Sequence, residues 1–268
     1  MPFESADDAR AEPPARESSP DASRGLTSSE AASPLLADGS HVAGALAVSV
    51  EALFRASERA LQWAWRVLQL ARANTEPTLP GARDIPAEAR ASVLEFLDHI
   101  PPHVRRGVVE LLGFCNLWQA VCARLSRVPV RAGDEASWRQ LGEDVQLLQR
   151  AAQARLGTAF ALEQGLLMHL GRLRELCRAE GPASAELRAS IESFTRGVAE
   201  VMASSSAVRR AWESTAEDLS ESASWLGAGD PGFIAWLAEH LMTLEPAWRQ
   251  AHASARWLQE VGGLAGHP

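Results

Sequence analysis

From Ser40 onward, apolar residues recur every three or four positions, in long runs that break only where proline and glycine cluster. That spacing is the period of an α-helix, whereas a half-buried strand alternates at every second residue. Alanine and leucine dominate the chain and tyrosine is absent, which favours helix over sheet. The sequence therefore predicts an all-α fold, an elongated multi-helix bundle of about six helices.

The breaks between the runs set the expected helix boundaries. Asp134 is a favourable N-cap, Pro101 and Pro102 are expected to end a helix before them, and Pro246 must kink or split the last one. The predicted helices span 41–74, 86–100, 103–127, 134–179, 185–226 and 233–260.

The fourth and fifth of these patterns would each be roughly 60 Å long if unbroken. Glycines at 157, 165 and 171 and serines at 204–206 are candidate interruptions. An elongated hairpin and a folded-over bundle both remain open. Over most of the chain the apolar positions alternate three and four residues apart, the spacing of coiled-coil packing.

The first 39 residues have a different composition from the rest. They are rich in serine, proline, alanine and acidic residues and lack apolar periodicity, so they cannot repay the entropy lost on ordering. We predict a disordered tail over 1–39 and one all-helical bundle domain over 40–262. The segment VPVRAGD marks a candidate sub-boundary near 128–133.

Two tryptophans lie two residues apart in the first predicted helix, Trp63 and Trp65. On a helical wheel they flank the wide apolar arc that remains outside a polar arc of about 100°. Small residues lie between them, including Ala60, Ala64 and Val67. Neither ring has to face water. The arc predicts a groove with a small-residue floor and two tryptophan walls, which would pack against several neighbouring helices or a partner chain.

Several classes of chemistry are excluded by residues that the sequence lacks. It contains no lysine, so a Schiff-base lysine and a P-loop are ruled out. The segment GAGDPG (227–232) matches a dinucleotide-binding pattern, but helical sequence precedes it where that motif requires a strand. Three cysteines without a C-x-x-C spacing predict no disulfide framework and a reducing, cytoplasmic setting. We expect no cofactor.

One short segment contains side chains that could bind a metal or exchange protons. In EFLDH, Glu95 and His99 are four residues apart and Asp98 adjoins them, so the three could share one helix face. Such a trio is more often a solvated helix end. We therefore predict no metal site and no catalytic residue, and keep Glu95, Asp98 and His99 as the alternative.

Charge and hydropathy limit the partners. The formal net charge is −8, and no more than two arginines are adjacent anywhere, at 105–106 and 209–210. Nonspecific nucleic-acid binding needs a clustered basic face instead. The longest uncharged stretch near the start, GSHVAGALAVSV, is too short to span a bilayer. We expect neither nucleic-acid binding nor a membrane span.

Abundant apolar periodicity without catalytic constellations predicts a non-catalytic helical scaffold or adaptor. It would act through helix-face protein–protein contacts, with a protein partner or by self-association, and the groove of Trp63 and Trp65 is the expected interaction site. The alternative function is a bundle that binds a small apolar ligand, as a sensor or carrier, in the same groove. A metal or acid/base enzyme at Glu95, Asp98 and His99 is the third alternative.

Overall fold

The structure is a computed structural model that describes residues 39–74, 84–131 and 133–264. The predicted tail, residues 1–39, lies outside the described residues apart from Gly39, where the first helix begins. The described elements are α2 (Gly39–Ala73), α3 (Ile85–Arg127), α4 (Glu135–Arg178), α5 (Ala185–Gly227), α6 (Pro231–Thr243) and α7 (Glu245–Leu264). No strand occurs among the described residues, and the predicted all-α bundle is confirmed.

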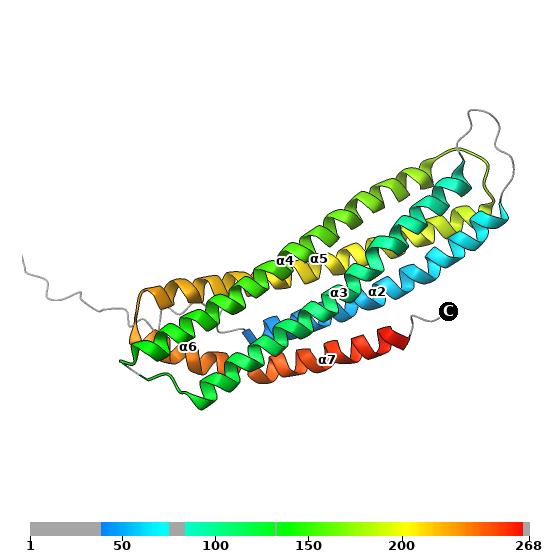
Figure 1. Cartoon of the computed structure of the whole chain (residues 1–268). Coiled ribbons are helices and arrows are strands. Elements are labelled where there is room, and N and C mark those ends of the chain that lie inside the picture. Colours follow the sequence, from blue (N-terminus) through cyan, green and yellow to red (C-terminus); the bar gives the residue numbers. More distant parts are fainter. Residues whose placement is uncertain (1–38, 75–83, 132, 265–268) are drawn as a thin grey trace, which may run out of the picture.

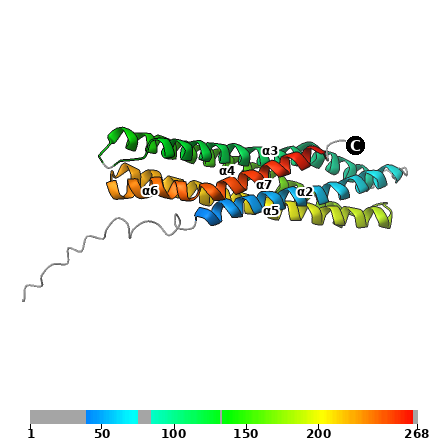
Figure 2. The same cartoon turned by 90° about the horizontal axis from the view of Figure 1, so that it is seen from below.

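The bundle is elongated because its main helices are long and lie side by side. In Figure 1, α2, α3, α4 and α5 run along the same axis, each in the opposite direction to the one before it. The short α6 lies at one end. From there α7 returns along α2 and α3 and covers them over only part of their length (Figures 1 and 2).

The helices α4 and α5 are continuous over 44 and 43 residues. A helix of that length measures about 65 Å, so the elongated hairpin is the arrangement that the structure has. A Cβ added at Gly157, Gly165 or Gly171 would meet no other atom within 4 Å. Each glycine costs about 1 kcal/mol of helix propensity, and this is too little to interrupt a helix whose apolar face is buried.

The prediction that Pro101 and Pro102 separate two helices is wrong, because α3 continues through both. Each proline removes one backbone hydrogen bond and crowds the preceding turn. The apolar face nevertheless stays in register across them, since Phe96, Ile100 and Val104 follow one another at four-residue intervals and all are buried. Packing of this face against the bundle outweighs the local preference for a break.

By length and composition, α3 is the one helix among the described residues that could cross a membrane. Of the most apolar 18-residue stretch of α3, 44% is buried inside the bundle. The core helix of a soluble protein can have the same length and apolar composition.

Two predicted helix boundaries are confirmed, the N-cap at Asp134 and the split at Pro246. Asp134 Oδ1 accepts hydrogen bonds from the backbone N–H groups of Ala136 and Ser137, at 3.2 and 3.4 Å. In GAGDPG, Gly229 has a φ of 72° and Asp230 caps α6, so this glycine-rich segment is a turn between helices. Pro246 lies in the first turn of α7, and α6 ends at Thr243, which is the predicted split.

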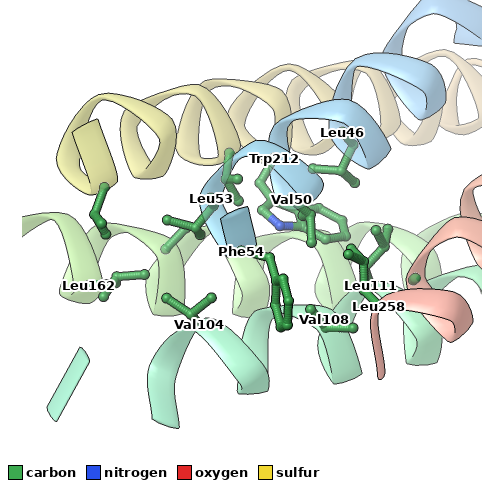
Figure 3. Close-up of a cluster of buried hydrophobic side chains, with 14 of the residues drawn as sticks. Leu46, Val50, Leu53, Phe54, Val104, Val108, Leu111, Leu162, Trp212 and Leu258 are labelled. Atoms are coloured by element: carbon green, nitrogen blue, oxygen red, sulfur yellow. The ribbon is translucent and has the colours of Figure 1, made fainter. Parts of the chain in front are cut away.

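The core follows the apolar stripes of the long helices. Figure 3 shows side chains of α2, α3, α4, α5 and α7 meeting in one cluster, including Leu46, Val50, Leu53, Phe54, Val104, Val108, Leu111, Leu162, Trp212 and Leu258. Near the predicted sub-boundary, Arg124 of α3 pairs with the buried Asp144 of α4, with Nε and Oδ2 3.0 Å apart. This pair joins the two helices on either side of residues 128–133.

Candidate functional site

The small-residue floor predicted on α2 is fully buried. Ala60, Ala64 and Val67 are each 0% exposed, and α5 packs on α2 at Ala60. A Cβ added at Gly197 of α5 would lie 3.2 Å from the Cα of Ala60, so the two backbones approach closely there. The floor is therefore filled from within the bundle.

The two tryptophans at the edges of this floor lie partly in solvent. Trp63 is 42% exposed and Trp65 is 54% exposed. The wheel allowed both rings to be buried, and the structure differs because the helices packed on α2 cover the middle of the apolar arc more fully than its edges. The predicted groove residues thus divide into a buried floor and two rings that face outward.

Trp63 lies between two ion pairs that join α2 to α5. Arg59, four residues before it, pairs with Glu200 at 3.0 Å, and Arg66, three residues after it, pairs with Glu186. Residues at these spacings are neighbours on a helix surface. A large aromatic ring is therefore bordered by charges of both signs at the α2–α5 seam.

A third exposed tryptophan, Trp257 on α7, was not predicted as a site residue. It is 46% exposed, and the guanidinium of Arg55 on α2 lies 5.5 Å from its ring centroid. The sequence could have indicated its exposure, because Trp257 lies outside the apolar stripe that Ala251, Ala255 and Leu258 form, and these three residues are buried. Trp257 thus lies beside α2, at Arg55. We call Trp63, Trp65 and Trp257 the tryptophan surface.

The trio Glu95, Asp98 and His99 does not form a shared ligand set. The Glu95 carboxylate binds Arg172 of α4 at 2.5 and 2.6 Å, and the His99 ring binds the backbone oxygen of Glu95 through Nδ1 at 2.8 Å. Within the described residues, no three His, Cys, Asp or Glu side chains converge as a metal site would require. Glu95 acts instead in an ion pair between α3 and α4.

The cysteines of α3 are small core residues. Burial raises the pKa of Cys115 to about 12 and that of Cys122 to about 11. Since the thiolate is the reactive form, both thiols are poor nucleophiles at neutral pH. All three cysteines are free.

A small cavity of about 30 Å³ lies near the junction of α6 and α7, with Thr215, Asp218 and Trp248 among its lining residues. Asp218 Oδ1 and Trp248 Nε1 are buried there without a hydrogen-bond partner among the described residues. Burial raises the pKa of Asp218 to about 6, and the nearby Glu221 and Glu217 add to the rise. This carboxyl group is therefore held in an environment that favours its neutral form.

The raised pKa of Asp218 predicts a pH-dependent stability. The folded-state pKa of about 6 exceeds the unfolded value of about 3.9, so the stabilisation is complete below the unfolded value and is lost as pH rises through 6. We expect Asp218→Asn to raise the free energy of unfolding by about 2–3 kcal/mol near pH 8 and to change it little near pH 4. Urea unfolding at both pH values tests this.

The control for this experiment is Glu217→Gln. Glu217 is exposed and contributes less to the raised pKa of Asp218 than burial does. Its removal should change stability only slightly at either pH. Equal stabilisation by Asp218→Asn at the two pH values would contradict the assignment.

No protein-family model matches the chain, and no curated protein matches it.

Proposed function

We propose that the protein is a non-catalytic helical scaffold or adaptor that works through the tryptophan surface, and that its first contact is with a second copy of itself. One observation carries the proposal: three tryptophans on α2 and α7 are each between 42% and 54% exposed. Tryptophan is among the residues most enriched at the energetic centres of protein interfaces.

Charge supports a symmetric partner. The ion pairs Arg59–Glu200 and Arg66–Glu186 border Trp63 with both signs of charge. A two-fold contact brings the same patch together from both subunits, so the arginines of one copy can face the glutamates of the other. The α2 helix, with 35 residues, is about 50 Å long and gives enough length for such an interface.

The experiment is light scattering coupled to size-exclusion chromatography at micromolar concentration. We expect the wild-type chain to form a dimer or larger assembly. The double variant Trp63→Ser/Trp65→Ser should weaken association by about 100-fold or more, because two interface tryptophans together contribute at least about 3 kcal/mol. Far-ultraviolet circular dichroism should be unchanged, since both rings are partly outside the core.

The matched control is Leu147→Ser. Leu147 is 41% exposed but lies on α4, outside the tryptophan surface, so its replacement should leave the assembly intact. A strictly monomeric wild-type mass, or equal loss of association in the control, would refute self-association through this surface.

A further inference from the structure

A second cavity lies on another side of the bundle, between α3 and α4, and has a volume of about 250 Å³. It is separate from the tryptophan surface and from the small cavity beside Asp218. Phe96, Ile100 and Leu162 give it apolar walls, and His99, His103 and His169 also line it. Mostly apolar walls with a few polar groups are typical of small-molecule sites.

The polar group that most needs explanation is His169. This residue is 5% exposed, and its Nε2 has no hydrogen-bond partner among the described residues. The rings of Phe96 and Phe194 lie against it, with centroids 5.7 and 6.2 Å from that of His169. Burial lowers the pKa of His169, which favours the neutral form of the imidazole. A buried imidazole with unused hydrogen-bonding capacity is uncommon in a structural core.

The other two imidazoles are oriented by their own helix. His99 Nδ1 lies 2.8 Å from the backbone oxygen of Glu95, and His103 Nδ1 lies 2.5 Å from that of His99. Because a carbonyl oxygen only accepts, Nδ1 carries the proton in each ring, and Nε2 of the neutral form keeps its lone pair. His99 and His103, which line the cavity, can thus each accept a hydrogen bond through Nε2.

Gly165 provides space in the α4 wall. It lines the cavity, and a Cβ added there would meet no other atom within 4 Å. A larger side chain at this position can therefore enter the cavity without disturbing the helix. This gives a way to fill the site while leaving its histidines in place.

We propose that the cavity between α3 and α4 binds a small apolar alcohol or phenol. The hydrocarbon part lies against Phe96, Ile100 and Leu162, and the hydroxyl group bonds to the unpartnered imidazole of His169. A hydroxyl suits this site because it can both donate and accept, so it can meet either tautomer of His169. This proposal does not depend on self-association and would stand if the tryptophan surface bound nothing.

The test is calorimetric titration of the full chain with phenol and with toluene, which lacks the hydroxyl. We expect saturable phenol binding that is about tenfold tighter than toluene binding, the effect of one hydrogen bond. His169→Phe keeps an aromatic ring but removes both nitrogens. It should reduce the preference for phenol to about threefold or less and leave toluene binding unchanged.

Gly165→Leu should abolish binding of both compounds by filling the cavity. Its control is Gly171→Leu on the same helix, which also has open space around the added Cβ but does not line the cavity, and which should bind as wild type does. Wild-type titrations that do not saturate, or phenol binding that survives Gly165→Leu, would overturn the proposal. Saturable Zn²⁺ binding that depends on His169, without phenol binding, would overturn it in favour of a metal site.

Discussion

Replacing Trp248 with alanine should lower the free energy of unfolding by about 3–5 kcal/mol, the usual cost of truncating a buried tryptophan. Trp248 is 2% exposed and is the largest buried side chain of α7. Its ring stacks on Trp118 with centroids 4.9 Å apart and packs against Phe114 at the same distance. Since the other buried side chains of α7 are smaller, the variant should loosen α7 from α2 and α3. Urea unfolding followed by far-ultraviolet circular dichroism measures the loss.

The matched control for this variant lies on the same helix. Trp257 is 46% exposed, and the guanidinium of Arg55 lies over its ring. Trp257→Ala should cost only about 1 kcal/mol, the size of an exposed cation–π contact. Equal destabilisation of the two variants would contradict the inference that Trp248 holds α7 against the bundle.

Local sequence rules predicted the cap at Asp134 and failed at the paired prolines. This cap depends only on an oxygen reaching N–H groups two or three residues away, so spacing alone identifies it. Whether α3 breaks at Pro101 depends instead on what covers Phe96, Ile100 and Val104. Those partners come from other helices, and a single local pattern does not contain them.

The candidate site shows the same division between local and distant information. The wheel of α2 predicted that Ala60, Ala64 and Val67 share one face, because helix geometry is local. The exposure of Trp63 and Trp65 depends on where neighbouring helices lie and how far α7 extends. Glu95 pairs with Arg172, which is 77 positions away. This pair and the cavity beside His169 could not be predicted from the sequence, because both arise from the packing of α3 on α4.

Replacing Gly197 with leucine should also destabilise the protein strongly, by about 2–3 kcal/mol net of the helix propensity gained. The first added carbon alone would lie 3.2 Å from the Ala60 Cα and 3.4 Å from its Cβ. Backbone cannot move aside as a flexible side chain can, so α2 and α5 must separate. The expected result is a lower midpoint of urea unfolding with the helical content of the folded state retained.

Gly171→Leu separates the clash from the general effect of replacing a helical glycine. No atom lies within 4 Å of the Cβ added there, so leucine should raise stability by up to about 1 kcal/mol. Gly197→Leu should in addition weaken self-association, because moving α5 away from α2 breaks the Arg59–Glu200 and Arg66–Glu186 pairs that border Trp63. A Gly197→Leu protein as stable as wild type would show that the α2–α5 contact is looser than 3.2 Å implies.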